Sequence, residues 1–305
     1  MAGSRTISRA LITGATGYIG HRLADALAAG GRHVHALVRP SSDRARLPAG
    51  TICHVWDGSQ DSVRRAVADS APDAVFHLAA VQSLSGPEPL GALVEGNVLM
   101  PLQLMTAMAE LKAGPGCPHL VTAATYWEYD EGGRFRPNSL YAASKRAALD
   151  FAAHYAHRGD LRTTALVLYD VYGEDDWRNK IFTEWRRRLG TDDPLDATAG
   201  EQEIGFVHVE DVVRGFIAAA ERPPGDAAAD EPATFALPAG RFVTLREAAA
   251  LLEEVSGRPL PVRWGARPYP PHQIFRPVRC LPVLPDWRTR IDLAEGFRRL
   301  LARPA

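Results

Sequence analysis

The sequence predicts an α/β fold: a doubly wound parallel sheet of the Rossmann type with a smaller, loop-rich C-terminal lobe. Three observations indicate it. Strand-like apolar runs alternate with helical patterns over the first half, glycines recur at the first strand-to-helix junction, and prolines crowd the last third. Strands that alternate with helices imply βαβ crossovers and parallel pairing. A chain of 305 residues can bury a substantial core in one large or two modest domains.

Two periodicities locate the individual elements. Short runs rich in apolar and β-branched residues predict buried strands, and segments with apolar residues every three or four positions predict helices. The expected strands are 10–13, 33–38, 52–55, 74–79, 119–123 and 162–169; the expected helices are 21–29, 63–70, 93–111, 141–157, 181–189, 245–256 and 293–301, with a further strand and helix within 205–220.

The character of the sequence changes after Gly173, where a charged, irregular stretch begins, and after Arg222, where prolines such as Pro223 and Pro224 accumulate. Closely spaced prolines disfavour long regular elements and suit a small lobe folded over a cleft. We therefore assign 1–173 and 204–222 to a dinucleotide-binding domain, and 174–203 and 223–305 to a substrate-binding lobe.

Charge and cysteine content narrow the classes of partner. The chain has 35 basic and 36 acidic residues, a net charge of −1, so it has no bulk attraction for nucleic acid or anionic membranes. No apolar run approaches the ~18 residues of a membrane span. Cys53, Cys117 and Cys280 lack metal-like spacing, so we expect free thiols in a reducing cytoplasm and no metal site.

Glycines recur every three residues at the first strand-to-helix junction, at Gly14, Gly17 and Gly20. A pyrophosphate must approach bare backbone amides at a helix N-terminus, where a side chain would block it. Alone such a triplet is weak evidence, but inside a strand–turn–helix it indicates dinucleotide binding. We expect Thr16, Tyr18 and Ile19 of the same turn to contact the dinucleotide.

The end of the second strand indicates which dinucleotide is bound. Folds selective for NAD usually carry an acid ≈ 20 residues beyond the turn, to hold the ribose hydroxyls. Here Arg39 and then Ser41 follow the strand, and a guanidinium suits a 2′-phosphate. We therefore expect NADP(H), the alternative being a solvated arginine. Asp57, after the third strand, is a candidate for the adenine amino group or a plain turn aspartate.

Tyr141 and Lys145 open one of the expected helices. Residues four apart lie on one helical face, about one turn (~6 Å) along the axis. We expect the ammonium to lower the pKa of the phenol from ≈ 10 toward the range of a general acid/base. The spacing is frequent by chance, but its position after a glycine turn and a further strand favours catalysis. Thr122 and Thr125 end that strand, where a hydroxyl reaches the ligand-binding crevice.

Taken together, these motifs resemble those of the extended short-chain dehydrogenases/reductases, in the nucleotide-sugar epimerase/dehydratase/reductase group. The resemblance implies that Thr125 is the catalytic hydroxyl, because it lies four residues before Tyr129, where the family usually has the tyrosine of a Val-Tyr-Gly motif. It also implies that Asn97 supports the lysine through water, the alternative being an ordinary polar helix residue. The residues that carry the resemblance extend over nearly the whole chain. They are 13–20, 77–80, Asn97, Thr125, 141–145, 171–173, 206–212, 285–288 and 293–296. The resemblance places Leu78, Ala79 and Ala80 at the cofactor.

Two segments, 125–129 and 168–182, are similar to bacterial CDP- and TDP-4-keto-6-deoxyhexose 4-ketoreductases of the CDP-paratose synthase type. Related dehydratases carry an acidic pair after the catalytic threonine. This chain has Tyr126 and Trp127 there, so dehydration is not expected. Asp130 replaces a usual glycine and Asp170 a frequent asparagine, and both changes bear on how the sugar is bound.

The resemblance therefore implies NADPH-dependent reduction of the C4 keto group of an NDP-4-keto-6-deoxyhexose, TDP-linked rather than CDP-linked, in an antibiotic-type deoxysugar pathway. Tyr141 would deliver the proton, Lys145 would lower its pKa and hold the nicotinamide ribose, and Thr125 would polarise the carbonyl. The candidate substrate contacts, several of which could equally be solvated surface residues, are Gln82, Tyr126, Trp127, Asn179, Lys180, Arg241 and Arg276.

The sequence is also compatible with other functions. A nucleotide-sugar 4-epimerase would use the same residues but keep NAD bound, and Arg39 counts against it. A plant-type flavonoid or aldehyde reductase shares that arginine but not the segment 177–182. A non-catalytic NADP(H) sensor would tend to lose the Tyr141/Lys145 pair. The resemblance also implies a homodimer, and the arginine run 186–188 is expected to be a solvated helix face.

Overall fold

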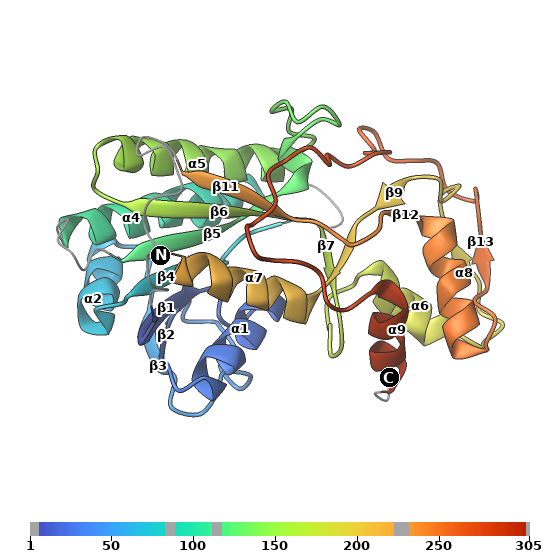
Figure 1. Cartoon of the computed structure of the whole chain (residues 1–305), viewed down its shortest axis with the longest axis horizontal. Coiled ribbons are helices and arrows are strands. Elements are labelled where there is room, and N and C mark those ends of the chain that lie inside the picture. The colour runs from blue at the N-terminus through green and yellow to red at the C-terminus, as the bar shows by residue number, and fades with distance from the viewer. Residues whose placement is uncertain (1–5, 83–88, 112–117, 223–231, 303–305) are drawn as a thin grey trace.

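The computed structural model describes residues 6–82, 89–111, 118–222 and 232–302; Cys117, Pro223 and Pro224 lie outside the described residues. Seven strands, all paired in parallel, form the central sheet in the order β11-β6-β5-β4-β1-β2-β3. The predicted doubly wound sheet is confirmed (Figure 1). The strands are β1 (Arg9–Thr13), β2 (His33–Val38), β3 (Ile52–Val55), β4 (Ala74–His77), β5 (His119–Thr125), β6 (Arg162–Leu168) and β11 (Ala233–Leu237).

Helices cover both faces of the sheet, which is why its strands are continuously apolar. Successive side chains of β1 alternate between the two faces. Ala10 and Ile12 pack into one core and Leu11 into the other. On the first face lie α1 (Tyr18–Ala29) and α7 (Val209–Glu221); on the second lie α2 (Gln60–Ser70), α4 (Met100–Glu110) and α5 (Leu140–His157).

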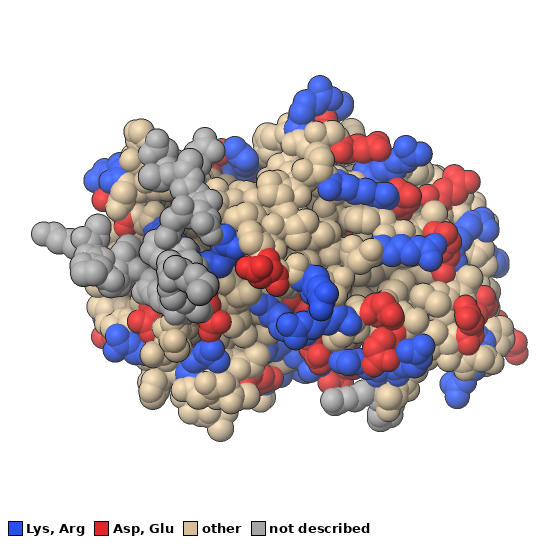
Figure 2. Space-filling model, in the orientation of Figure 1, with Lys and Arg blue, Asp and Glu red and all other residues tan. Residues whose placement is uncertain are grey.

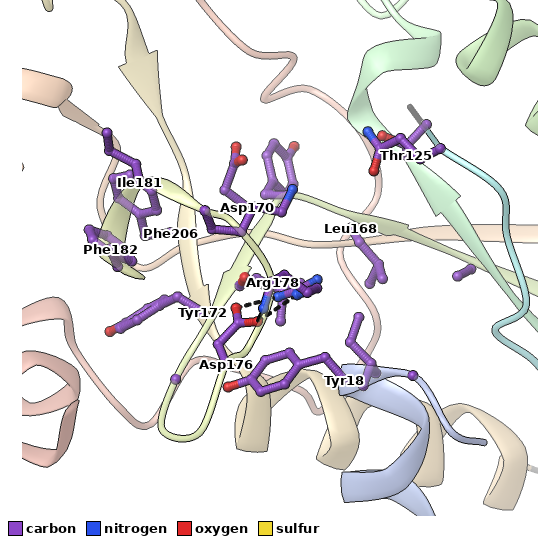
Figure 3. A pocket seen from close by; sticks show the side chains of 18 of the residues that line it. Tyr18, Thr125, Leu168, Asp170, Tyr172, Asp176, Arg178, Ile181, Phe182 and Phe206 are labelled. Atoms are coloured by element: carbon purple, nitrogen blue, oxygen red, sulfur yellow. Dashed lines mark hydrogen bonds and ion pairs between the residues drawn. The ribbon is translucent and has the colours of Figure 1, made fainter. Parts of the chain in front are cut away.

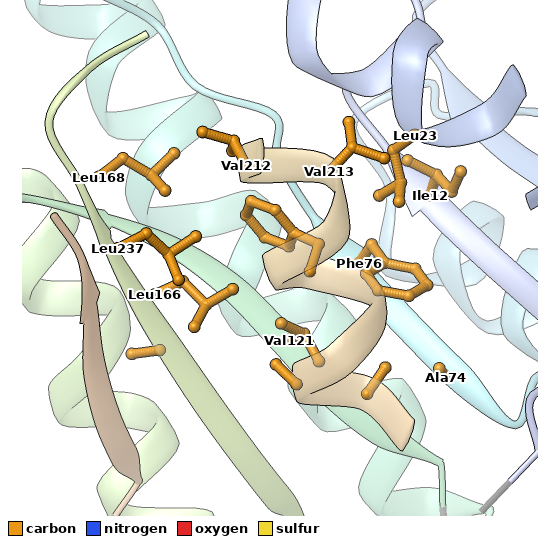
Figure 4. Packing of buried hydrophobic residues seen from close by; sticks show 14 of the residues in the cluster. Ile12, Leu23, Ala74, Phe76, Val121, Leu166, Leu168, Val212, Val213 and Leu237 are labelled. Carbon is orange, nitrogen blue, oxygen red and sulfur yellow. The ribbon is translucent and has the colours of Figure 1, made fainter. Parts of the chain in front are cut away.

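The core beneath α7 fixes this helix to the sheet (Figure 4). The rings of Phe76 on β4 and Phe216 on α7 are both fully buried, with centroids 6.5 Å apart in an edge-on arrangement. Val212 and Val213 extend the contact along the helix. Burying each large apolar side chain stabilises the fold by about 1.5–3 kcal/mol, so α7 is held firmly against the strands.

A smaller lobe lies beside the sheet, on the right of Figure 1. Its own core contains Phe182, Trp185, Leu252 and Phe297. The strands outside the central sheet are two or three residues long, too short for periodicity alone to predict. The elements outside the central sheet and the helices that cover it are β7 (Asp170–Tyr172), α6 (Ile181–Arg188), β8 (Leu195–Asp196), β9 (Glu203–Ile204), β10 (Phe206–His208), β12 (Val243–Thr244), α8 (Leu245–Ser256), β13 (Val262–Arg263) and α9 (Leu293–Ala302).

Strand β11 corrects the predicted domain boundaries. It lies within the range assigned to the substrate lobe, yet it pairs in parallel with β6 at the edge of the central sheet. Pro232 and Pro238 flank this strand rather than interrupt it, and prolines are compatible with strand ends and edges. The segment therefore belongs with the sheet, and the rest of the domain division stays a prediction.

The predicted helix at 93–111 is also interrupted. It comprises α3 (Leu90–Val94), a π-helical turn η1 (Glu95–Leu99) and α4. Pro101 has no N–H to bond the carbonyl of Asn97, so the regular α-helical ladder cannot continue through this turn. The result places Asn97, which is 1% exposed, inside the molecule.

An extended segment after Leu284 returns from the lobe and docks on α7. The fully buried Asp211 accepts hydrogen bonds from the backbone N–H groups of Arg290 and Ile291, both at 3.0 Å, and it pairs with Arg214. The Trp287 indole N–H donates to the Asp211 carbonyl at 2.9 Å. This anchor joins the lobe to the sheet.

Acidic and basic side chains are interspersed over the surface that Figure 2 shows around the smaller lobe. Among the described residues, no helix is both long and apolar enough to cross a membrane.

The Asp211 anchor gives a stability prediction. We expect Asp211→Ala to lower the free energy of unfolding by about 3 kcal/mol, because Arg214 and the backbone N–H groups of Arg290 and Ile291 lose their acceptor. Urea unfolding followed by circular dichroism measures this. The exposed Asp25 on α1 is the control: Asp25→Ala should change stability by less than about 0.5 kcal/mol. Equal losses in both variants would contradict the assigned role.

Candidate active site

Two adjoining cavities lie at the carboxyl ends of the central strands. The central cavity, about 500 Å³, lies between the sheet and the smaller lobe, and the edge cavity, about 550 Å³, lies over the ends of β2 and β3. Ligands of open α/β sheets bind at this edge. Both cavities are lined by Gly14, Gly17, Tyr18, Leu78, Ala80 and Arg178.

The glycine turn has the geometry that a phosphate needs. Gly14 has φ +72°, and a Cβ there would lie 2.5 Å from the backbone N of Ala79; a Cβ on Gly20 would collide with the Gly14 carbonyl. Gly17 caps α1 without a side-chain hydrogen bond. The first-turn N–H groups of α1 thus have no side-chain cap and can receive an anion.

A hydrogen-bonded pair beneath the turn sets its position. The Thr13 hydroxyl lies 2.8 Å from Nδ1 of His77, and it accepts a hydrogen bond from Ala79 N at 3.3 Å. Burial lowers the pKa of His77 to about 3, with a further contribution from the Lys145 charge, so the imidazole is neutral. These bonds bring the chain after β4 against the chain after β1.

The edge cavity contains the residues predicted to choose the dinucleotide. Arg39, Ser41, Asp57, Thr16 and Ala79 all line it. The Asp57 carboxylate accepts hydrogen bonds from the Ser59 hydroxyl at 2.6 Å and from the Ser59 N–H at 2.9 Å. These bonds lower the pKa of Asp57 to about 2. Asp57 is therefore a turn aspartate that also borders the cavity, and its contact with the adenine amino group stays a prediction.

Tyr141 and Lys145 both line the central cavity, together with Thr125. Helix α5 begins where Ser139 accepts a hydrogen bond from Ala142 N at 3.2 Å, and the spacing of four then places phenol and amine on one face. The ring of Trp127 meets that of Tyr141 edge-on, with centroids 6.1 Å apart. The predicted grouping of these residues matches this arrangement.

The predicted effect on the pKa of the tyrosine is wrong. Burial raises the pKa of Tyr141 to about 12, and the charge of Glu128 adds to this. Burial also lowers the pKa of Lys145 to about 8, against an opposing effect of Glu128. The spacing of four residues indicates the nearby ammonium, but it shows neither the loss of hydration nor the nearby acid. The phenol therefore carries its proton at neutral pH.

Thr125, rather than Thr122, presents its hydroxyl to the central cavity. Thr125 caps the short 3₁₀ helix η2 (Tyr126–Glu128): its Oγ1 accepts from Trp127 N at 3.3 Å, and its own N–H donates to Glu128 Oε1 at 2.9 Å. Since Oγ1 accepts from the backbone, its proton remains available for a ligand. Thr122 is buried in β5 and lines neither cavity.

Asn97 lines neither cavity and acts from behind the site. Its side chain accepts from Val81 N at 2.7 Å and donates to Val81 O at 2.8 Å and to the Ser144 hydroxyl at 2.9 Å. It therefore ties the chain after β4 to the residue preceding Lys145.

The remaining candidates separate into two groups. Gln82, Tyr126, Trp127 and Lys180 line the central cavity, as does Ile19 of the glycine turn. Asn179 lines neither cavity, and two arginines form ion pairs elsewhere: Arg241 with Glu247 at 3.4 Å and Arg276 with Glu131 at 3.7 Å.

Several lining residues were not predicted. Arg178 is held by Asp176 through two hydrogen bonds of 2.7 Å and lies 4.4 Å from the ring centroid of Tyr18 (Figure 3). Arg186 also lines the central cavity, so the arginine run 186–188 is not simply a solvated helix face. Arg178 lies inside a segment that the sequence singled out, whereas the orientation of Arg186 depends on how α6 packs.

Tyr126 and Asp170 form a polar contact in the same cavity. The phenol donates to Asp170 Oδ2 at 2.9 Å, and burial raises the pKa of this carboxyl. The ring of Tyr126 stacks on Tyr169, with centroids 5.2 Å apart. This wall of the cavity thus carries an acceptor.

A parallel sheet with a glycine turn at a helix N-terminus, and a tyrosine and lysine one turn apart in the adjoining cavity, defines the short-chain dehydrogenase/reductase class. Residues 10–230 match the NAD dependent epimerase/dehydratase family, and the chain belongs to that family. The resemblance to the extended, nucleotide-sugar group is confirmed.

Individual relatives are distant but cover most of the chain. The chain is 25% identical to CDP-abequose synthase of Salmonella typhimurium, over 96% of this chain and 97% of that protein. It is 28% identical to UDP-glucose 4-epimerase of Streptomyces lividans, over 82% of each. Among solved structures, MoeE5 in complex with UDP-glucuronic acid and NAD has a TM-score of 0.77 at 26% identity, over 96% of this chain and 98% of that chain.

The glycine turn gives a binding prediction. Gly14→Ala should weaken nicotinamide dinucleotide binding about ten-fold or more, because alanine is strained at φ +72° and its Cβ would push away the chain at Ala79. Isothermal titration calorimetry measures the affinity. Gly91→Ala, where the added Cβ would meet nothing within 4 Å, should leave it unchanged. If Gly14→Ala bound as tightly as the control, the turn would not be the phosphate site.

Proposed function

We propose that this chain catalyses the NADPH-dependent reduction of the C4 keto group of an NDP-4-keto-6-deoxyhexose. The observation that carries the proposal is that Thr125, Tyr141 and Lys145 line one cavity, and that this cavity adjoins the glycine turn. A substrate carbonyl placed in this cavity would lie beside both the Thr125 hydroxyl and the protonated Tyr141 phenol. Curated relatives named CDP-abequose synthase add support for a nucleotide-linked sugar.

The residues of the chain divide the chemistry as follows. A bound reduced nicotinamide supplies the hydride that adds to C4 of the sugar. Thr125 donates a hydrogen bond to the carbonyl oxygen and draws electron density toward it. Tyr141 transfers its phenolic proton to that oxygen as the C–H bond forms, and the product is an alcohol. The ammonium of Lys145 stabilises the phenolate that remains until a proton from solvent restores the phenol.

The far end of the central cavity suits the rest of a nucleotide sugar. Two cations, Lys180 and Arg186, line the central cavity but not the edge cavity, and they can take a diphosphate. Asp170 offers a carboxylate oxygen beyond the one bound by Tyr126, and this oxygen can accept from a sugar hydroxyl. Asparagine at that position would supply a donor as well, so the aspartate favours a sugar that presents hydroxyl groups here.

Tyr141 gives the direct test of the reaction. Tyr141→Phe should lower kcat by about 100-fold or more, because the proton donor is lost while the ring remains. The measurement is NADPH oxidation at 340 nm with TDP- and CDP-linked 4-keto-6-deoxyhexoses, which also identifies the base. Dinucleotide affinity, measured by calorimetry, serves as the control for intact folding. A variant that kept most of its turnover would overturn the assignment.

Arg39 gives the test of cofactor choice. Removing its guanidinium by Arg39→Ala should reduce the preference for NADPH over NADH about ten-fold, since a charge-assisted bond to the 2′-phosphate is lost. The ratio of kcat/KM for the two cofactors measures the preference. Arg44→Ala is the matched control, because Arg44 is exposed in the same loop and lines neither cavity. An unchanged ratio in Arg39→Ala would favour NAD.

A 4-epimerase is the second candidate. The observation that favours it is the presence of UDP-glucose 4-epimerases among the relatives, together with the NAD in the MoeE5 complex. An epimerase returns its hydride, so purified protein would carry stoichiometric NAD and consume no NADPH. A protein that bound NADPH but reduced no carbonyl would instead fit a redox sensor.

The expected homodimer and cytoplasmic location stay predictions. Exposed apolar side chains on the outer helices support a dimer face, namely Leu90, Val94, Leu99 and Leu140. Sedimentation velocity would decide the oligomeric state.

A further inference from the structure

The central cavity and the edge cavity meet along a short stretch of common wall. Apart from Arg178, the described residues that line both cavities are glycines, an alanine, a leucine and a tyrosine. Among the described residues, Arg178 is therefore the single charged side chain at the junction of the two cavities. A cation in this place needs an explanation, because the glycine turn beside it already offers backbone N–H groups to an anion.

The junction is where the phosphates of a dinucleotide would lie. A nicotinamide dinucleotide consists of two nucleosides joined by a diphosphate. We expect its adenosine half in the edge cavity, which Arg39 lines, and its nicotinamide half in the central cavity beside Tyr141. The diphosphate then passes through the junction. A helix N-terminus supplies roughly half an elementary charge, whereas the diphosphate carries a full negative charge on each phosphate, so a side-chain cation at the junction would reduce the imbalance.

The chain segment that carries Arg178 is fastened to helix α1. The Tyr18 hydroxyl donates to the carbonyl of Glu174 at 3.0 Å, and Arg22 donates to the same carbonyl at 2.8 Å. The ring of Trp177 meets that of Tyr18 edge-on, with centroids 5.7 Å apart. This segment follows β7 in the chain, yet it lies on the first turns of α1, immediately after the glycine turn.

The guanidinium of Arg178 is held in one orientation (Figure 3). Its Nε and Nη2 each donate to the Asp176 carboxylate at 2.7 Å, and Nη2 also donates to the Val171 carbonyl at 3.0 Å. The guanidinium carbon lies 4.4 Å from the ring centroid of Tyr18, the residue with which α1 begins. The remaining nitrogen, Nη1, has no hydrogen-bond partner among the described residues. The N–H groups of Nη1 therefore remain for a ligand.

We propose that Arg178 is a ligand of the dinucleotide diphosphate, to which its Nη1 donates while Asp176 holds the guanidinium in place. Arg178 and Asp176 together carry no net charge, so Arg178 acts through a fixed, charge-assisted hydrogen bond rather than through long-range attraction. The inference requires that the chain binds a nicotinamide dinucleotide, but not that it reduces a sugar.

A second diphosphate could reach the same guanidinium, namely that of a nucleotide sugar in the central cavity. Lys180 and Arg186 line the central cavity alone and are the cations at that end. Arg178 also lines the edge cavity, which a sugar nucleotide held in the central cavity would not need to enter. The position of Arg178 at the junction therefore favours the diphosphate of the dinucleotide.

Calorimetric titration with NADPH and with NADH tests the proposal. Arg178→Gln should weaken the binding of both by about ten-fold or more, because both contain the same diphosphate and lose a charge-assisted hydrogen bond. Arg187→Gln is the matched control, because Arg187 is exposed on α6, pairs with Glu184 at 2.9 Å and lines neither cavity. It should leave both affinities in place. Unchanged affinities in Arg178→Gln would overturn the proposal.

A double variant separates the lost hydrogen bond from an unpaired charge. Arg178→Gln leaves Asp176 without its partner, and the freed carboxylate would itself repel a diphosphate. Combining Asp176→Asn with Arg178→Gln removes both charges and keeps the net charge of the wild type. We expect the double variant to bind NADPH and NADH about ten-fold more weakly than the wild type, whereas full recovery of affinity would count against a direct contact. If Arg178→Gln does not fold, the double variant, which leaves no unpaired buried carboxylate, gives the same two outcomes.

Titration with TDP, CDP and UDP identifies which diphosphate Arg178 meets. We expect Arg178→Gln to bind these nucleoside diphosphates as the wild type does. A loss of their affinity without a loss for NADPH and NADH would assign Arg178 to the substrate and overturn the proposal. A loss confined to NADPH would do the same, because it would assign Arg178 to the 2′-phosphate. Absence of reductase activity would defeat the proposed function and leave these titrations as they are.

Discussion

The close approach of two chain segments at the carboxyl edge of the sheet is the constraint on which the site depends. The turn after β1 runs against the chain after β4, with Gly14 against the backbone of Ala79 and a hydrogen bond between the side chains of Thr13 and His77. Helix α1 starts immediately afterwards, so its uncapped N–H groups border both cavities. A side chain at position 14 would part the segments and displace the anion site and the cavity wall together.

Burial at the site also determines the protonation states of its side chains. Tyr141, Lys145 and Glu128 lie where water is scarce, and burial penalises the charged form of each. Burial is the largest cause of the raised pKa of Tyr141, and the charge of Glu128 adds to it. The phenol is consequently protonated in the resting protein.

Local patterns were sufficient to predict the sheet and the common placement of Tyr141 and Lys145, because buried parallel strands are continuously apolar and a spacing of four fixes one helical face. They failed where the outcome depends on distant partners. Strand β11 acquires its identity from pairing with β6, and the orientations of Arg186 and Arg241 follow from packing within the small lobe. The prediction of a lowered pKa for Tyr141 was wrong for the same reason. Burial and the charge of Glu128 raise this pKa, and both depend on how η2 folds against α5.

The distribution of residues over the two cavities explains how distant relatives can share this fold and differ in substrate. The groups proposed to move protons, Tyr141 and Lys145, are on a long helix packed against the sheet, where small displacements are costly. The groups proposed to meet the sugar, such as Asp170 and Lys180, come from short strands and loops outside the central sheet. We expect substitutions there to alter hydrogen bonding to the sugar without disturbing Tyr141 and Lys145. Glu128 belongs with the first set, because it follows Thr125 in η2 and accepts a hydrogen bond from the Thr125 N–H.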